Sequence, residues 1–161
     1  MKLEDIKKIY FIGIGGIGMS ALARYFNSRQ VEVFGYDKTE TKLTKKLVGE
    51  GMEIHFEDDV SQIPEEVDLV VFTPAIPKSH DELNYFLENN FLVKKRSEVL
   101  GIISRSKKTI GVAGTHGKTS TSSVLTWMLK VGGIDCTAFL GGIAHERFLI
   151  VRSQHGCIVV L

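Results

Sequence analysis

The sequence has few cysteines, no long apolar run and almost no excess of charge, and each of these absences excludes a class of protein. Only Cys136 and Cys157 occur among 161 residues, and they form no CxxC pair, so we expect a reduced, cytoplasmic protein rather than a disulfide-stapled one. No apolar run reaches the length of a membrane span. The formal net charge of +1 gives no electrostatic reason to expect a nucleic acid or an anionic membrane as partner.

Three other segments are too weakly patterned to predict a site or a targeting signal. Residues 1–16 contain acidic side chains and no small-residue cleavage site, which is not typical of a signal peptide. His145, His155 and Cys157 are close in sequence but match no zinc spacing. The basic triplet 94–96 is short, so we expect a solvated strand end there.

What the sequence does contain is an alternation of strand and helix patterns. Strands are expected at 8–14, 31–37, 67–73, 91–93 and 107–113, and helices at 17–26, 39–48 (with Thr39 or Thr41 as its cap), 81–89, 97–104 and 120–131. Such repetition predicts an α/β fold, a Rossmann-like parallel sheet with flanking helices. The basic, serine-containing stretch 104–108 is the best linker, so we expect one domain over 1–106 and the beginning of a P-loop ATPase-type α/β domain over 107–161.

The last third of the chain raises two further expectations. In the helix at 120–131, the apolar side chains Leu125, Trp127, Met128 and Leu129 are expected in the core. After Gly142 come two apolar runs, 148–151 and 157–161. A buried strand at the last residue implies that its neighbours are missing, so we expect the front of a longer protein.

The first glycine loop, GIGGIG at 13–18, lies between an expected strand and an expected helix. A GxGxxG pattern uses one glycine for the sharp turn, one that lets a diphosphate approach the backbone, and one that lets the helix pack closely on the strand. The helix N-terminus offers free N–H groups and partial positive charge to the anion. Asp37 either hydrogen-bonds a ribose hydroxyl or serves only as a turn or cap residue. Because NAD, FAD and UDP-sugars all present a diphosphate, the loop does not identify which nucleotide is bound.

The second glycine loop, GTHGKT at 114–119, also separates an expected strand from an expected helix. Its N–H groups can form a nest for phosphate oxygens, Lys118 offers an ammonium group, and the Thr119 hydroxyl can ligate Mg²⁺. This arrangement predicts ATP as the ligand. The general GxxxxGK[ST] pattern places a glycine where this chain has Val112. His116 either touches phosphate or substrate, or only shapes the turn.

Across most of its length the sequence resembles the Mur ligases of bacterial peptidoglycan synthesis. The matching segments are GIGGIGMSALA (13–23), GYD (35–37), DLVVFTPAIP (68–77), KRSEVLGIISR (95–105), GVAGTHGKTSTSSVLTWML (111–129) and FLGGIA (139–144). The GxxGTxGKT form of the phosphate loop is the form of this family, so Val112 agrees with the resemblance. The histidine in GTHGKT narrows it to the alanine-adding ligases and the ligase that recycles murein tripeptide, and GIGGIGMS favours alanine addition.

The resemblance implies a three-domain, ATP-dependent amide-bond ligase that adds L-alanine to UDP-N-acetylmuramate through an acyl phosphate. It implies ATP-binding residues Gly114, Thr115, His116, Gly117, Lys118, Thr119 and Ser120. Of these, Lys118 and Thr119 are expected to be catalytic, and Thr119 to hold Mg²⁺. It implies UDP-sugar-binding residues Gly13, Gly15, Gly16, Gly18, Met19, Ser20, Asp37, Thr73 and Ala75.

The sequence departs from the family at one motif, and it is compatible with several alternatives. The family has an acidic metal-ligand motif after the strand that follows FLGGIA, whereas this chain has no Asp or Glu after Glu146. We therefore expect an N-terminal fragment that binds a UDP-sugar and is inactive by itself. The alternatives are the tripeptide-recycling ligase and a non-catalytic module that binds a dinucleotide. A Rossmann-type dehydrogenase is disfavoured by the second phosphate loop.

Overall fold

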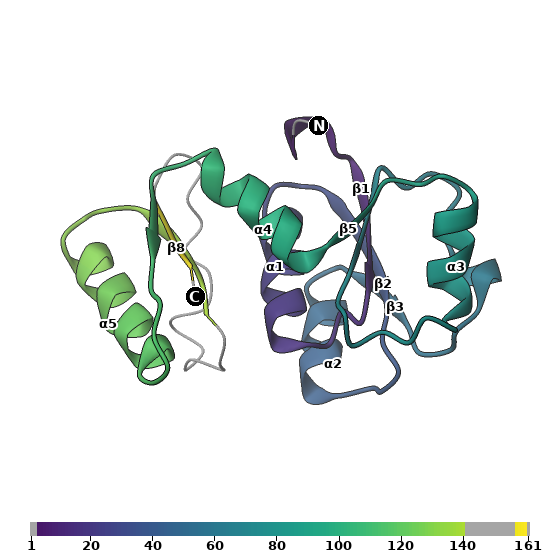
Figure 1. Ribbon diagram of the computed structural model, residues 1–161, viewed down its shortest axis with the longest axis horizontal. Helices are drawn as coiled ribbons and strands as arrows, with labels where there is room; N and C mark the ends of the chain where they lie inside the picture. Colours follow the sequence, from purple (N-terminus) through teal and green to yellow (C-terminus); the bar gives the residue numbers. More distant parts are fainter. Residues whose placement is uncertain (1–2, 141–156, 161) are drawn as a thin grey trace. The chain divides into compact units, whose positions relative to one another are not determined.

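The structure, a computed structural model, describes residues 3–140 and 157–160 (Figure 1). By its contacts the chain divides into two units, Met1–Val99 and Leu100–Leu161. This division falls within helix α4 (Arg96–Arg105), shortly before the domain boundary expected near residue 106. No helix in the described ranges is both long and apolar enough to cross a membrane.

A sheet of five parallel strands forms the centre of the first unit, in the order β3-β2-β1-β4-β5. The strands are β1 (Lys8–Ile12), β2 (Glu32–Tyr36), β3 (Glu53–His55), β4 (Leu69–Phe72) and β5 (Val93–Lys95). Because β2 and β3 lie on one side of β1 while β4 and β5 lie on the other, the strand order reverses between β1 and β4. Open α/β sheets bind ligands beyond the carboxyl ends of the strands at such a switch point.

Helices cover both faces of this sheet (Figure 1). On one face, α1 (Ile17–Asn27) contacts α2 (Lys42–Gly49), and on the other lies α3 (Asp81–Glu88). Successive residues of β1 serve the two faces, since Phe11 packs on Phe26 of α1 whereas Tyr10 packs on Phe86 of α3. All of these side chains are buried. The predicted parallel sheet with helices on both faces is thus confirmed, and residues 9–12 of its central strand are fully buried because they have no solvent face.

Most element boundaries agree with the sequence patterns within a few residues. Thr41 is confirmed as the cap of α2: its hydroxyl accepts from the Thr44 N–H (3.2 Å), and the Thr44 hydroxyl accepts from the Thr41 N–H (2.8 Å). This reciprocal pair is a capping box. The strand expected at 91–93 begins later, as β5. The sequence patterns missed β3 and β7 (Cys136–Phe139), as well as two short 3₁₀ turns, η1 (Leu3–Asp5) and η2 (Val60–Gln62).

The second unit contains a parallel sheet in the order β6-β8-β7. Its elements are β6 (Thr109–Gly111), α5 (Lys118–Val131), β7 (Cys136–Phe139) and β8 (Cys157–Val160). The expectation that the terminal strand lacks neighbours is wrong, because β8 pairs with β6 on one side and β7 on the other. The apolar run at 148–151 lies outside the described residues.

The core of the second unit lies between α5 and its sheet. Leu125 and Leu129 pack with Val112 against a buried cluster that includes Leu140, which confirms the core role of the two leucines. The expectation for Trp127 and Met128 is wrong, because their side chains are 51% and 60% exposed. Leu125 and Leu129 are one turn apart on the same side of α5, and intervening residues point in other directions.

Candidate functional site

The first candidate site lies at the switch point, where the loops after β1 and β4 meet. Gly13 has a φ of +86°, a conformation that suits glycine. The N–H groups of Gly13 and Ile14 both donate to the Tyr36 carbonyl, at 2.8 and 3.0 Å, which ties the glycine loop to the end of β2. A Cβ added to Gly13 would lie 3.2 Å from Cδ1 of Ile76. The loops that follow β1 and β4 are therefore packed against each other.

Asp37 holds the glycine loop from its other side. Its Oδ2 accepts a hydrogen bond from the Gly15 N–H (2.7 Å), and its Oδ1 accepts one from the Thr39 N–H (3.2 Å). A Cβ on Gly15 would lie 2.8 Å from Asp37 Oδ2 and 2.9 Å from Cγ2 of Thr44. Position 15 requires glycine because a side chain there would block the approach of Asp37 and α2 to the loop. The turn role considered for Asp37 is present, and its ribose contact stays a prediction.

The N-terminus of α1 presents unbonded main-chain amides at this site. The N-cap is Gly16, no side chain caps it, and the first turn holds no acidic residue. The first backbone bond of the helix runs from the Ser20 N–H to the Gly16 carbonyl, 2.8 Å, so the N–H groups of Ile17, Gly18 and Met19 lie beyond the helical bonding pattern. These amides and the positive end of the helix dipole favour an anion.

Met19 and Ser20 direct their side chains into the protein interior. They are 1% and 3% exposed, and the Ser20 hydroxyl donates to the Ile17 carbonyl at 2.9 Å. Met19 can thus serve a bound anion only through its N–H. The binding role expected for Ser20 stays a prediction.

Thr73 and Ala75 form a tight turn directly after β4. The Thr73 hydroxyl accepts from the Ala75 N–H (3.1 Å), and the Thr73 carbonyl accepts from the Ile76 N–H (3.1 Å). Since Ile76 also packs beside Gly13, this turn borders the glycine loop. The structure thus brings together the glycine loop and the turn at 73–76, which the resemblance assigns to the same ligand.

Sequence reasoning missed Arg96, the first residue of α4. It was expected within a solvated strand end, but its side chain is partly buried. A Cβ on Gly18 would lie 2.9 Å from Nη1 of Arg96, so this glycine makes room for the guanidinium group, not only for strand packing. The available signal was its position after a strand of the same sheet, within the segment KRSEVL.

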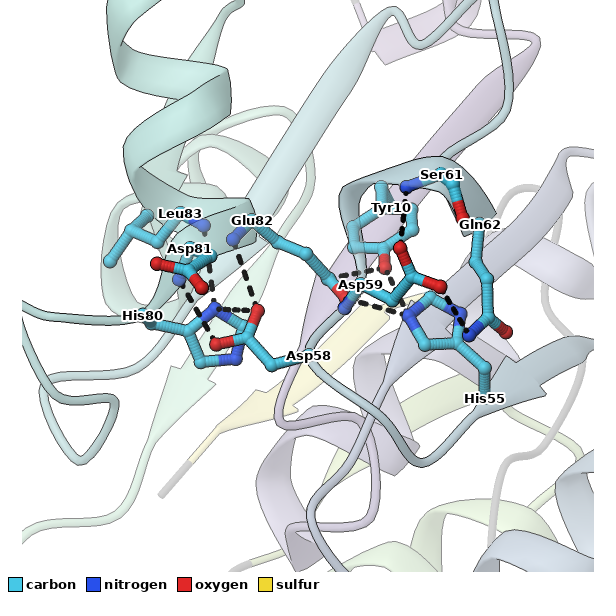
Figure 2. Close-up of polar contacts among 10 residues, drawn as sticks. All are labelled: Tyr10, His55, Asp58, Asp59, Ser61, Gln62, His80, Asp81, Glu82 and Leu83. Atoms are coloured by element: carbon cyan, nitrogen blue, oxygen red, sulfur yellow. Dashed lines mark hydrogen bonds and ion pairs between the residues drawn. The ribbon is translucent and has the colours of Figure 1, made fainter.

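A buried polar network fastens α3 to the sheet (Figure 2). Glu82 is fully buried. Its Oε2 accepts from the Tyr10 hydroxyl (2.5 Å), and its Oε1 accepts from Nε2 of His55 (2.7 Å) and from the Asp59 N–H (3.2 Å). Burial, together with the Glu82 carboxylate, raises the pKa of Tyr10, so the phenol remains a donor. The network joins β1, β3 and α3.

Beside this network, Asp58 caps the N-terminus of α3. Its carboxylate accepts from the N–H groups of Asp81 and Glu82 at 3.0 and 3.1 Å, and its Oδ1 lies 3.2 Å from Nδ1 of His80. Asp58, His80 and Glu82 place ligand atoms within 4.8 Å of one another. Because both carboxylates already accept hydrogen bonds from backbone or side chains, we interpret this cluster as part of the structural network. Sequence patterns could not reveal it, because Asp58 is more than 20 positions from His80 and Glu82 at the start of α3.

The second candidate site is the loop between β6 and α5. Gly114 and Gly117 have φ angles of +153° and +74°, so the glycines stand where the backbone requires them. Val112 has no positive φ and packs in the core, which is why no glycine is needed there. Nζ of Lys118 donates to the carbonyls of Gly114 (2.6 Å) and Thr115 (3.3 Å). The ammonium group therefore lies over the loop.

These residues fit a nucleoside triphosphate with Mg²⁺. The N-cap of α5 is Gly117, without a side-chain cap or an acidic residue in the first turn, and the first backbone bond runs from the Thr121 N–H to the Gly117 carbonyl (2.9 Å). The preceding N–H groups thus remain for phosphate oxygens. His116 is exposed, with Nδ1 3.1 Å from the Thr115 hydroxyl, which leaves both of its predicted roles open.

Comparison with known proteins decides the family. The model of the Mur ligase family, catalytic domain, matches residues 8–108, which is more than half of the chain. The chain belongs to the Mur ligase family. It is 56% identical over 150 residues to UDP-N-acetylmuramate–L-alanine ligase of Flavobacterium johnsoniae, covering 91% of this chain and 33% of that protein. It is 52% identical over 162 residues to the protein of the same name from Cytophaga hutchinsonii, covering 97% and 35%.

Solved structures of other Mur ligases have the same fold as this chain. UDP-N-acetylmuramate-alanine ligase from Thermotoga maritima matches with a TM-score of 0.86 and 31% identity, over 96% of this chain and 36% of that one. UDP-N-acetylmuramate:L-alanyl-gamma-D-glutamyl-meso-diaminopimelate ligase from Neisseria meningitides matches with a TM-score of 0.84 and 27% identity, over 96% and 52%. The chain spans about a third of the length of the curated relatives described above.

Proposed function

We propose that the chain is the nucleotide-binding part of an ATP-dependent UDP-N-acetylmuramate–L-alanine ligase of peptidoglycan synthesis, working in the cytoplasm. The observation that carries the proposal is the glycine loop at the switch point of the first sheet, whose amides are oriented to receive a diphosphate. Support also comes from relatives of that name at 56% and 52% identity.

The first site receives UDP-N-acetylmuramate in this proposal. The diphosphate lies against the loop 13–18, where the amides of Ile17, Gly18 and Met19 donate to its oxygens. Asp37 fixes the loop through Gly15. Thr73 and Ala75, which border the loop, line the uridine and sugar side.

The second site receives ATP through residues 114–120. Lys118 and the main-chain amides of the loop neutralise negative charge on the phosphates, and they would do so most effectively as charge builds during phosphoryl transfer. The Thr119 hydroxyl is the ligand this loop offers to Mg²⁺, which supplies further neutralisation of phosphate charge. Phosphorylation of the muramate carboxylate gives that poor acyl donor a leaving group, which the amine of L-alanine displaces.

The tripeptide-recycling ligase is kept as the second candidate because its solved relative matches almost as well as the alanine ligase, with TM-scores of 0.84 and 0.86. The identity of 31% against 27% favours alanine addition. Competition between L-alanine and the tripeptide in the full-length enzyme separates the two candidates.

Thermal unfolding of the 161-residue chain tests the proposed ligand. We expect UDP-N-acetylmuramate to raise the melting temperature, by an amount that corresponds to about 2.7 kcal/mol at 100 times its Kd, and NAD to have no effect. Equal protection by NAD would favour the non-catalytic dinucleotide module. The isolated chain is expected to release no ADP with L-alanine present, and detectable alanine-dependent release would show that it is catalytic alone.

A further inference from the structure

We propose that His80 positions the glycine loop at 13–18 for its nucleotide, an inference that rests on the proposed UDP-sugar function. His80 lies at the start of α3, outside the segments that resemble the family. Three observations carry the inference: a capping role that His80 fills poorly, a buried nitrogen without a partner, and an aromatic contact to the strand that holds the loop.

Capping of α3 does not by itself explain a histidine at position 80. Short polar side chains cap helices best, and Asp58 already accepts from the Asp81 and Glu82 N–H groups at this end. Nδ1 of His80 accepts from the Leu83 N–H at the long distance of 3.4 Å, and it also lies 3.2 Å from Asp58 Oδ1 (Figure 2). The first contact needs a lone pair on Nδ1 and the second needs a proton, so only one of them is a hydrogen bond at a time.

The other ring nitrogen of His80 is buried without a partner. The residue is 6% exposed, and its Nε2 has no hydrogen-bond partner among the residues that the structure describes. A buried nitrogen in this state costs free energy, and such groups are rare in folded proteins. Asparagine or serine would cap the helix without this cost. The imidazole ring must therefore supply something that those side chains lack.

What the ring supplies is a packing surface for Tyr36, the last residue of β2. The ring centroids of His80 and Tyr36 are 4.6 Å apart with an interplanar angle of 72°, an edge-to-face arrangement that aromatic pairs favour. His55 contacts the same tyrosine ring, with centroids 5.8 Å apart, and its Nε2 is bonded to the buried Glu82 carboxylate (2.7 Å). Two histidines of the buried polar network thus fix the Tyr36 ring.

Tyr36 in turn holds the glycine loop. Its carbonyl accepts from both the Gly13 and Ile14 N–H groups, at 2.8 and 3.0 Å. The segment that leads from β4 to His80 also touches the loop directly, because Ile76 packs beside Gly13. This segment therefore braces the glycine loop twice, at Gly13 and through Tyr36. Displacement of the Tyr36 ring would shift the carbonyl to which two loop amides are bonded, and with it the amides offered to the nucleotide.

Two substitutions of His80 separate positioning from structural support. His80→Asn keeps a favoured N-cap but removes the ring, whereas His80→Phe keeps the ring and removes the cap. The measurement is titration calorimetry with UDP on the 161-residue chain, below the melting temperatures of all variants. His80→Asn should bind UDP about 3- to 10-fold more weakly because one aromatic pair is lost, and His80→Phe should stay within about 2-fold of wild type. Ser79→Ala, at the exposed neighbouring position, is the control and should leave UDP affinity unchanged.

A double-mutant cycle with Tyr36→Leu tests the route through the tyrosine. Because Tyr36→Leu removes the ring on which His80 packs, His80→Asn should have little further effect on UDP affinity in that background. Fully additive effects would contradict the proposal, as would any result in which His80→Asn does not bind UDP more weakly than His80→Phe. If His80 were only structural, UDP affinity would follow the melting temperature of each variant, whichever side chain replaced the histidine.

Failure of this inference is distinguishable from failure of the proposed function. Hydrogen exchange of the ligand-free chain, followed by NMR, reports directly on the Gly13 and Ile14 amides. They should exchange about 3- to 10-fold faster in His80→Asn than in wild type or His80→Phe. The Glu32 amide, which donates to the Lys7 carbonyl at the opposite end of β1 (2.8 Å), should be unchanged. If the wild type binds no UDP, the proposed function fails, and faster exchange of the two loop amides in His80→Asn would still support the role of His80. Unchanged exchange would overturn that role even if UDP binds.

Discussion

The two glycine loops of this chain occupy equivalent positions but are stabilised by different contacts. Both stand between a parallel strand and a helix whose N-terminus is capped by glycine. The loop at 13–18 is held by two groups from outside it, the Tyr36 carbonyl and the Asp37 carboxylate, and the Arg96 side chain lies beside Gly18. In the loop at 114–119, residues 114–117 are exposed, and the side chain of Lys118 donates to two carbonyls of the same loop.

This difference shows which parts of the sequence specify the conformation of each loop. The second loop is nearly self-contained, so a short sequence motif describes it completely. The first loop depends on residues from β2, the segment after it and α4, so its GxGxxG motif describes only part of the site. We therefore expect substitutions far along the sequence to affect the first loop, and local substitutions to affect the second.

The largest effect is expected from Lys118→Met, which should break the second loop alone. Removal of the ammonium group deletes the charge that faces the phosphates, so ATP affinity should fall by about 100-fold or more, which corresponds to about 2.7 kcal/mol. Titration calorimetry with ATP measures the loss, and UDP affinity should be unchanged. Lys130→Met, in the last turn of the same helix, is the control. ATP affinity within about 2-fold of wild type would show that the loop does not bind triphosphate through Lys118.

A smaller effect is expected from Gly15→Ala, which should break the first loop through its neighbours. The new methyl group would crowd Asp37 and Thr44 at 2.8 and 2.9 Å, and such overpacking costs about 1–3 kcal/mol of unfolding free energy. UDP affinity should fall and ATP affinity should not. Gly49→Ala is the matched control, because nothing lies within 4 Å of a Cβ there. Equal behaviour of the two variants in chemical denaturation would contradict the clamp that we describe for Asp37.

The smallest effect is expected from Asp68→Asn, at the opposite end of β1 from the glycine loop. Asp68 Oδ2 accepts from the N–H groups of Lys7 and Lys8 at 2.8 and 2.9 Å. The bond from Lys8, with that from Lys7, lowers the pKa of Asp68 below its usual value. A carboxyl group with a lowered folded pKa stabilises the protein above its unfolded pKa, and the stabilisation is lost as the pH falls through the folded pKa.

Circular dichroism melting curves as a function of pH check this prediction. After allowance for solvent screening at this exposed position, the wild type should be more stable than Asp68→Asn by about 0.5–1 kcal/mol near pH 7. The difference should shrink as the pH falls below about 4. Glu65→Gln, an exposed acidic neighbour, serves as control. A difference that persists unchanged to about pH 2 would mean that the charge of Asp68 is not its cause.

The strands of the two sheets illustrate how far sequence patterns reach. Strands β1 and β4 were predictable because both faces are buried, which demands an unbroken apolar run. Strand β3 was not, since its three residues include Glu53 and His55 and none of them is fully buried. Trp127 was assigned to the core by its apolar character, but its exposure depends on which side of α5 faces the sheet.

The candidate sites also contain some features that sequence patterns could predict and others that they could not. Glycine spacing identified both loops, because local backbone conformation and close approach restrict a position to glycine. The partners of the first loop were not recognisable, since Arg96 and the network around Glu82 meet their neighbours only after the sheet has formed. Glu82, for example, accepts a hydrogen bond from Tyr10, which lies 72 positions earlier.

The sequence by itself determined the α/β class and the positions of the two glycine loops, because apolar periodicity and glycine spacing are local consequences of backbone geometry. The Mur ligase family was identified from the resemblance of whole segments of the sequence. Only the tertiary structure decided that Asp37 clamps the first loop, that Glu82 is satisfied by three donors, and that a guanidinium group stands beside Gly18. Parallel strands bring distant segments to one edge of a sheet, and the distances across that edge are fixed by packing, not by the order of the residues.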